Sequence, residues 1–291
     1  MKKNKGNIIT IIICIVVLIA LCVGGFFLIK RFTGIHVSLN SDTKFDITFD
    51  TKANVKADET PVPQNWSVSM PIFMYHFILD DYGPYPDTEN FLKPETLEEQ
   101  LKYISENGYQ TVFMNEFDKL YKYEKPVCLT FDDCFVYFYN NAFPLLKKYN
   151  QKATIYVITD YINGENYLTD EQIKEMDESG LVEIASHTCS HQYLNEMTYD
   201  EQLHELRDSK QRLEELIGKP VTTVAYPTGY NDDTTVQISK EYYSFGVEML
   251  GGTYNTLQHT NDFRIPRIYA NRTMPLSTFA SHCSQARVRV N

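Results

Sequence analysis

The sequence has no excess of positive charge. Its 27 Lys and Arg residues are outnumbered by 38 Asp and Glu residues, which gives a formal net charge of −11. The phosphate backbone of a nucleic acid demands a basic binding face, so this composition excludes a nucleic-acid-binding protein. Disorder is also excluded, because 21 Tyr and 17 Phe residues provide ample apolar surface for a core. The 291 residues suit one large domain or two small ones.

Cysteine is scarce and irregularly placed. Two of the six cysteines, Cys14 and Cys22, lie in an apolar run, and the other four form no C-x-x-C pair. This spacing excludes a disulfide-stapled fold and a zinc finger. Cys134 and Cys189 adjoin polar motifs described below. They could form a disulfide, supply a soft metal ligand or simply be small side chains that fit, and we favour the last.

Only one hydrophobic run is long, and it covers residues 6–29 without a charge. About 20 apolar residues cross a bilayer, and bulky residues stand where a signal peptide would need small ones before its cleavage site. Three lysines precede the run, whereas only Lys30 and Arg31 follow it. The positive-inside rule then places the N-terminus in the cytoplasm. We therefore predict one transmembrane helix and a single-pass protein of the cell membrane.

The rest of the chain divides by composition. Residues 1–31 form the predicted membrane anchor, and residues 32–67 are polar and interrupted by proline, which is typical of a stalk. A single strand is expected within the stalk at residues 45–49. Residues 68–291 form the predicted catalytic domain, which lies outside the cell.

Short apolar runs alternate with helical patterns in this domain. The helical pattern is clearest over residues 95–107 and 199–217, each of which has leucines on one face and a glycine after its end. Sustained alternation of strand and helix favours a parallel sheet. We predict an α/β fold, a distorted (β/α) barrel of seven or eight parallel strands. The predicted strands cover residues 71–75, 110–113, 127–131, 153–158, 181–185, 222–226, 244–249 and 264–269.

Reactive side chains follow or border five of these strands. In a parallel barrel the carboxyl ends of the strands meet at one rim, which carries the active site. We therefore expect these residues to lie close together. They are His76, Asp132 with Asp133, His187 with His191, Thr228 and Arg267.

The spacing of two of these groups predicts a metal site. His187 and His191 are four residues apart, which on a helical turn directs both imidazoles toward one ion. Two histidines and one carboxylate with open positions suit Zn²⁺ or another borderline divalent metal. Of Asp132 and Asp133, one could ligate the ion and the other could act as a base. Alone, the aspartates could be a solvated turn and the histidines a surface pair.

Three stretches resemble, in the same order, the first three motifs of the polysaccharide deacetylases, carbohydrate esterase family 4. They are residues 130–133, 187–191 and 226–229. The resemblance extends over about residues 70–285.

The resemblance implies roles for these residues. Asp132 would be the catalytic base, and the backbone N–H of Thr228 would stabilise the oxyanion. A divalent metal ion, most readily Zn²⁺, would be held by Asp133, His187 and His191.

The segment that ends at His76 is similar to the subgroup that deacetylates poly-N-acetylglucosamine. In that subgroup the first strand supplies the catalytic histidine, so the resemblance implies His76 as the general acid. The alternative is a core histidine at a strand end. His282 lies in an apparent helix, Leu276–Cys283, away from the strand ends, and we assign it no role.

Three positions depart from the family pattern. Cys134 stands where the family usually has Gly, and Thr228 stands where it usually has an aromatic wall of the sugar pocket. The arginine that orients the base is missing from the third motif. We expect Arg267 to replace it, the alternative being an exposed strand-end arginine.

We therefore expect a membrane-anchored, metal-dependent enzyme that removes N-acetyl groups from an extracellular, acetylated amino-sugar polysaccharide. One alternative is a catalytically silent carbohydrate-binding homologue. Another is a deacetylase of peptidoglycan, chitin-like oligomers or acetylated xylan.

Overall fold

A computed structural model describes residues 35–39, 45–49, 62–80, 89–133, 135–249, 251–259 and 261–290. The chain divides into two compact units, Met1–Pro61 and Val62–Asn291. In the first, β1 (Ile35–Leu39) and β2 (Phe45–Phe49) form an antiparallel pair. The predicted transmembrane run lies outside the described residues. Among the residues that are described, no helix is long and apolar enough to cross a bilayer.

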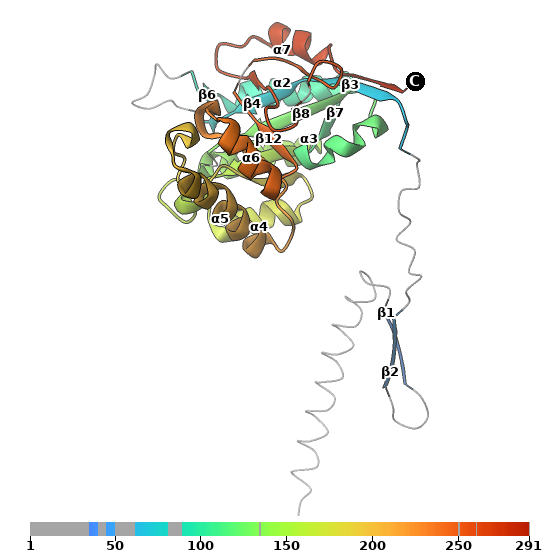
Figure 1. Ribbon diagram of the computed structural model, residues 1–291. Helices are drawn as coiled ribbons and strands as arrows, with labels where there is room; N and C mark the ends of the chain where they lie inside the picture. The colour runs from blue at the N-terminus through green and yellow to red at the C-terminus, as the bar shows by residue number, and fades with distance from the viewer. Residues whose placement is uncertain are drawn as a thin grey trace, which may run out of the picture. The chain divides into compact units, whose positions relative to one another are not determined.

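The second unit is built on a parallel sheet of eight strands (Figure 1). The strand order is β12, β11, β10, β9, β8, β4 and β14, and β7 pairs with β8 beside this path. All of these pairings are parallel. The strands are β4 (Ile72–Tyr75), β7 (Gln110–Val112), β8 (Pro126–Phe131), β9 (Ala153–Val157), β10 (Val182–Ser186), β11 (Thr223–Ala225), β12 (Phe245–Val247) and β14 (Ile268–Tyr269).

The predicted parallel strands are confirmed, but the sheet is a curled half-barrel rather than a complete barrel. An isolated parallel bridge pairs Val247, in the edge strand β12, with Ile265, which precedes the other edge strand β14. There the N–H of Ile265 donates to Gly246 at 2.9 Å. The last strand is shorter than predicted, because Pro266 has no N–H to donate to a ladder.

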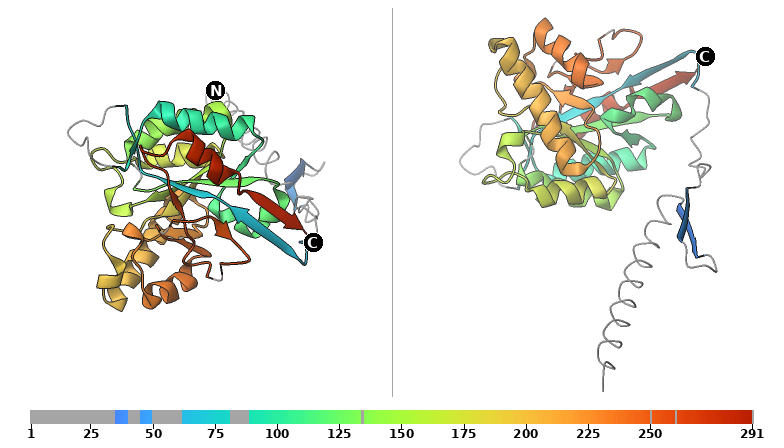
Figure 2. Two further views of the ribbon diagram at one scale, coloured as in Figure 1. Left: turned by 90° about the horizontal axis from the view of Figure 1, so that it is seen from above. Right: turned by 60° about the horizontal axis from the view of Figure 1, so that its bottom comes forward.

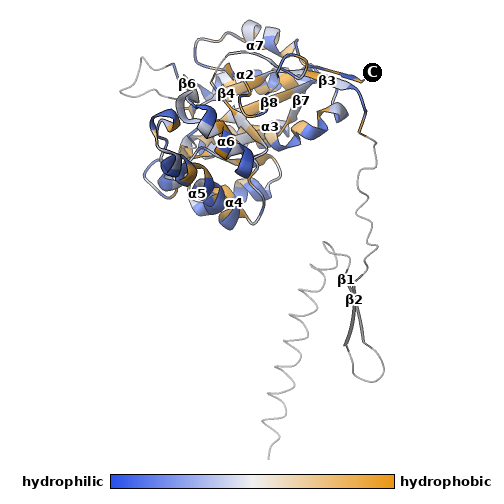
Figure 3. Cartoon of the chain, in the orientation of Figure 1, coloured by the Kyte–Doolittle hydropathy of each residue, from blue (hydrophilic) through white to orange (hydrophobic). Residues whose placement is uncertain are grey.

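Helices cover the outer side of the curled sheet (Figure 1). Helix α5 covers the residues that the sequence predicts; it follows Thr198 and ends at Gly218, whose φ of 67° only glycine adopts readily. The outer surfaces of α4 and α5 are hydrophilic, whereas the strands beneath the helices are largely hydrophobic (Figure 3). The helices are α2 (Pro94–Glu106), α3 (Phe143–Tyr149), α4 (Asp170–Glu178), α5 (Tyr199–Ile217), α6 (Asp233–Tyr242) and α7 (Leu276–Cys283).

Short helical turns connect several elements. They are the 3₁₀ turns η1 (Met114–Lys122), η3 (Thr159–Tyr161), η4 (Leu194–Glu196) and η5 (Pro227–Gly229), and the π turn η2 (Phe138–Ala142).

The alternation of side chains along the strands separates two environments. Leu129, Ile155 and Ile184 belong to the large core that also contains the helix residues. Successive strand residues face opposite sides, so their neighbours line the inside of the curl. Many of these inward residues, such as Cys128, Tyr156 and Ala225, form a second and smaller apolar cluster. Buried polar side chains lie among the inward positions as well, and they are Thr130, Thr154, Glu183 and Arg267. The interior of the half-barrel can therefore hold charged groups.

Two small sheets complete the unit. The antiparallel sheet has the order β13 (Tyr254–Asn255), β3 (Trp66–Met70) and β15 (Arg287–Val290). Figure 2 shows β3 and β15 side by side near the C-terminus. The parallel pair β5 (Phe77–Ile78) and β6 (Phe91–Leu92) follows β4.

The inward-facing Glu183 generates a prediction about stability. Its carboxylate accepts from the Thr154 hydroxyl at 2.6 Å, but burial raises its pKa to about 7. Between the unfolded value near 4.5 and pH 7, the folded chain retains a proton that the unfolded chain loses. Stability should therefore fall by about 3 kcal/mol as the pH rises through this window.

Glu183→Gln should remove this slope in urea unfolding measured from pH 4.5 to 8. As a control, Glu215→Gln on the exposed face of α5 should keep it. An unchanged slope in Glu183→Gln would show that another group causes the pH dependence.

Candidate metal centre and active site

Three side chains at the carboxyl ends of β8 and β10 converge. The Oδ1 atom of Asp133 lies 3.4 Å from Nε2 of His187 and 3.3 Å from Nε2 of His191. One ligand atom from each residue lies within 4.8 Å of the others. His187 is buried, whereas the side chain of His191 is 30% exposed, so solvent reaches the cluster from that side.

The donor set of this cluster fits a divalent cation. Oδ1 of Asp133 is buried yet makes no hydrogen bond. The Nδ1 atom of His187 lies 2.8 Å from the Ala225 carbonyl oxygen, which can only accept, so Nδ1 carries the proton and Nε2 keeps a lone pair for the cluster. Burial would lower the pKa of His187, but Asp133 and Asp132 raise it overall. The cluster is therefore a negative environment that favours a cation.

The sequence analysis expected the two histidines on one helical turn, and this expectation is wrong. They belong to an irregular loop after β10, in which Thr188 and His191 have φ values of 66° and 59°. Asp133 and Thr228 also have positive φ, 65° and 58°. Among the described residues, the other non-glycine residues with such values are all asparagines. Left-handed backbone is uncommon for a β-branched residue such as Thr and concentrates at functional sites.

The left-handed turn explains how two adjacent aspartates serve one site. In an extended strand, consecutive side chains point in opposite directions. Asp132 continues β8 toward the interior of the curl, and Asp133 leaves the strand conformation. The two carboxylates therefore acquire different partners.

Asp132 is held by Arg267 in a buried bidentate ion pair. Two guanidinium nitrogens donate to the two carboxylate oxygens, each at 2.7 Å, and these side chains are 3% and 0% exposed. Arg267 also donates to the Thr130 hydroxyl and to the carbonyl oxygen of Glu248, both at 3.0 Å. Burial acts to raise the pKa of Asp132, but Arg267 holds it below its ordinary value. Asp132 is therefore an ionised carboxylate.

Arg267 lies elsewhere on its strand than the sequence analysis expected. It precedes β14, and the register of β14 with β4 places it level with the start of β4 rather than at the rim. Its long side chain spans the interior to reach Asp132. The alternative of an exposed strand-end arginine is wrong.

His76 and Thr228 also follow the carboxyl ends of parallel strands. Tyr75 and Phe131 are register partners, so His76 and Asp132 leave the sheet side by side, and the Asp132 N–H donates to Tyr75 at 2.9 Å. Burial lowers the pKa of His76, and the charges of Asp132 and Asp133 oppose this shift. Thr228 lies in the turn that follows β11.

The remaining candidates lie apart from the cluster. The Cys189 thiol is directed to the α5 carbonyl oxygens of His204 and Glu205, 3.7 and 3.6 Å away, and burial raises its pKa to about 12. It is a free thiol, which favours the interpretation as a small side chain that fits. Cys134 lies outside the described residues. His282 lies on α7 with its ring 6.2 Å from that of Phe73.

The sequence analysis missed Glu205. This buried α5 carboxylate accepts from the backbone N–H groups of Cys189 and Ser190, each at 2.8 Å, and from the Ser190 hydroxyl at 2.6 Å. It thereby fixes the loop between His187 and His191. The one signal in the sequence is that Glu205 places a charged residue within the leucine pattern of α5.

Comparison with known proteins agrees with this geometry. A family model described as polysaccharide deacetylase matches residues 119–244. YxkH of Bacillus subtilis, whose name places it among the polysaccharide deacetylases, is 35% identical over 204 residues, which are 68% of each chain. The chain belongs to the polysaccharide deacetylase family. This membership makes it an enzyme, and the resemblance of its three motifs to that family is confirmed.

Two further relatives are informative. The poly-beta-1,6-N-acetyl-D-glucosamine N-deacetylase of Staphylococcus aureus is 30% identical over 191 residues, which cover 59% of this chain and 64% of that protein. The structure of the Streptococcus pyogenes deacetylase PplD in complex with acetate is 31% identical with a TM-score of 0.70, and the match covers 74% of this chain and 98% of PplD. The curled parallel sheet is thus the fold of this family.

The contacts of Glu205 generate a prediction about metal affinity. Groups that orient metal ligands typically contribute about 10- to 100-fold to affinity. Glu205→Gln weakens the charge-assisted hydrogen bonds to the loop, and we expect the Zn²⁺ affinity, measured by chelator competition, to fall by about that factor. Glu215→Gln, which removes the same charge from the exposed side of α5, should leave the affinity unchanged. Equal affinities for the two variants would contradict this role of Glu205.

Proposed function

We propose that this chain is a metal-dependent hydrolase that removes N-acetyl groups from an extracellular amino-sugar polymer of the poly-N-acetylglucosamine type. The observation that carries the proposal is the position of Asp132. It is an ionised carboxylate held by Arg267, and its strand β8 lies between β4, which ends before His76, and β9 and β10, the latter ending before His187. An ionised base beside a cation site suits hydrolysis of an amide.

Each residue has a chemical task in this proposal. Asp133, His187 and His191 would hold a divalent cation, most readily Zn²⁺. When bound, such a cation polarises the acetamide carbonyl and makes water more acidic.

Asp132 takes a proton from the attacking water, because each of its oxygens retains a lone pair beyond the one that Arg267 occupies. The backbone N–H of Thr228 donates to the developing oxyanion. His76, when protonated, gives its proton to the departing amine, so acetate and a free glucosamine unit are the products.

The substrate class rests on two supports. His76 comes from the first strand of the parallel sheet, as in the subgroup that this chain resembles. The Staphylococcus aureus relative is named for its action on poly-beta-1,6-N-acetyl-D-glucosamine. The location outside a cell membrane rests on the apolar run of residues 6–29 and the lysines before it.

The division of labour between the two aspartates provides the first test. His187→Ala should lose both bound metal and acetate release, because it removes a ligand. Asp132→Asn should retain metal and lose acetate release, because the amide cannot accept the proton. Metal analysis and acetate release from poly-N-acetylglucosamine measure both.

A panel with peptidoglycan, chitin oligomers and acetylated xylan then identifies the polymer. Metal binding by the wild type without acetate release from any of them would support a silent carbohydrate-binding protein instead. Loss of metal from Asp132→Asn would reverse the roles of the two aspartates.

The second test concerns the general acid, which contributes about 10²- to 10⁴-fold to a rate. His76→Ala should lower acetate release by that factor, with unchanged metal content. His282→Ala should have almost no effect, since His282 lies on α7, where its ring packs against that of Phe73 in β4. Near-normal turnover of His76→Ala with severe loss in His282→Ala would place the acid at the C-terminal end and remove the main support for poly-N-acetylglucosamine.

A further inference from the structure

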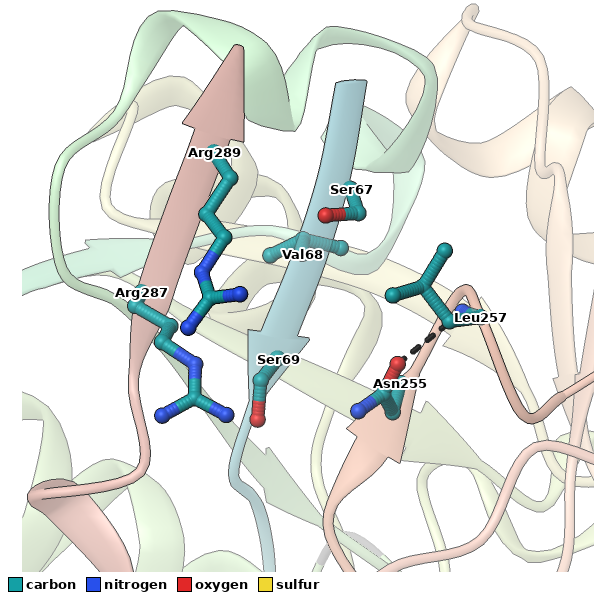
Figure 4. A pocket seen from close by; sticks show the side chains of 7 residues that line it. All are labelled: Ser67, Val68, Ser69, Asn255, Leu257, Arg287 and Arg289. Atoms are coloured by element: carbon teal, nitrogen blue, oxygen red, sulfur yellow. Dashed lines mark hydrogen bonds between the residues drawn. The ribbon is translucent and has the colours of Figure 1, made fainter. Parts of the chain in front are cut away.

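A polar cleft lies on the small antiparallel sheet (Figure 4). Arg287 is the register partner of Ser69, and Arg289 is the partner of Ser67. On the other side of β3, Asn255 is the partner of Ser69. Cross-strand partners share a face of a sheet, so these side chains lie on one face. The cleft is lined by Ser67, Val68, Ser69, Asn255, Leu257, Arg287 and Arg289.

The polar side chains of this cleft can all donate hydrogen bonds to a ligand. Guanidinium groups only donate, and hydroxyl groups can donate. The side-chain oxygen of Asn255 already accepts from the Leu257 N–H at 2.9 Å, as Figure 4 shows, which leaves its NH₂ group as a donor. Within the described part of the chain, neither Arg287 nor Arg289 forms a salt bridge. The cleft therefore favours an anion.

Its surroundings strengthen this conclusion. No acidic residue lines the cleft or the adjoining one formed by Gln64, Asn65, Trp66, Ser67, Leu257 and Arg289. In a chain with a net charge of −11, a cleft with two arginines and no carboxylate is a local reversal of charge.

The arrangement suits a phosphate group. The two arginines are two residues apart on β15, which separates their backbone positions by about 6.6 Å. Both guanidinium groups can therefore reach one tetrahedral anion. Arginine binds phosphate through paired hydrogen bonds. Ser67 and Ser69 are 9% and 8% exposed and form the floor between the strands.

A neighbouring apolar side chain indicates which kind of molecule carries the phosphate. Leu257 lines both clefts and is 75% exposed. An exposed apolar side chain beside arginines is what the headgroup region of an anionic bilayer accommodates. A free phosphate ion would gain nothing from this leucine.

The position in the fold agrees with a membrane surface. β3 leads through Pro71 into β4, and β4 delivers His76 at its far end, so the cleft lies near the start of β4 and the metal cluster at the opposite end. The unit begins at Val62, four residues before β3. In the sequence, the chain that carries the apolar run of residues 6–29 therefore enters this domain just before β3, the strand of Ser67 and Ser69.

We propose that the face formed by Ser67, Ser69, Asn255, Leu257, Arg287 and Arg289 docks on anionic phospholipids by binding a headgroup phosphate. Docking in this way directs the candidate metal centre away from the bilayer. The proposal does not depend on the proposed substrate.

The experiment uses the full chain with a single indole in the cleft. Trp66 is the only tryptophan of the sequence, so Trp66→Phe combined with Leu257→Trp leaves one reporter beside the arginines. Vesicles with brominated acyl chains quench an indole that lies at the membrane. We expect quenching when phosphatidylglycerol is present and little with phosphatidylcholine alone, and this quenching should weaken as salt is added.

Arg287→Gln with Arg289→Gln tests the two arginines in that background. Each basic residue near an anionic surface contributes roughly fivefold, so the ratio of docked to undocked chains should fall by about 30-fold. Lys174→Gln with Lys240→Gln makes the same charge change on exposed positions of α4 and α6 and should retain the quenching.

Three results would overturn the proposal. They are equal quenching by both kinds of vesicle, quenching that survives in the double arginine variant, and quenching abolished by millimolar inorganic phosphate that itself binds the chain. The last would assign the cleft to free phosphate. If the arginine variant is poorly folded, the salt dependence of quenching in the parent chain tests the proposal by itself.

Discussion

The buried ion pair between Asp132 and Arg267 is the interaction on which the rest of the structure depends. Arg267 precedes the edge strand β14, Glu248 follows the other edge strand β12, and Asp132 follows the interior strand β8. One side chain therefore connects the middle of the sheet to both edges. Removal of one partner from a buried pair costs about 3–5 kcal/mol, a large part of the stability of a domain. The same side chain that keeps the Asp132 carboxylate ionised also contacts the carbonyl oxygen of Glu248, beyond the end of β12.

Buried polar side chains inside the curl make this possible. The alternation that directs Leu129 and Ile155 outward to the helices directs Thr130 and Thr154 inward. The hydroxyl of Thr130 meets Arg267, and that of Thr154 meets Glu183. Arg267 and Glu183 therefore both have polar partners inside the curl, while the larger apolar cluster lies in the outer layer between strands and helices.

The sequence was sufficient to predict the parallel strands and α5, because periodicity and glycine stops are local signals. It also grouped His76, Asp132 and His187, since the ends of parallel strands meet at one rim. The loop geometry of His191 could not be predicted, because its positive φ occurs at residues other than glycine. Glu205 was missed for another reason: its partners lie on a loop that only the fold brings to α5.

The pairing of strands that are distant in the sequence could not be predicted from the sequence either. β3 joins β15 although more than 200 residues separate them, and its Ser-Val-Ser sequence is typical of a polar stalk. Arg267 was expected only as a replacement for the arginine that the family carries in its third motif, and its burial against Asp132 depends on the fold. These features arise from tertiary packing, which overrides local preference.

The left-handed backbone of Asp133, Thr188, His191 and Thr228 has a consequence for evolution of the chain. Each such conformation costs a residue other than glycine about 1 kcal/mol or more. Glycine would relieve the strain, but at Asp133 and His191 it would delete the very side chains that form the cluster. At these two positions a substitution that relaxes the backbone would therefore break up the cluster, whereas glycine at Thr188 or Thr228 would leave its three side chains in place.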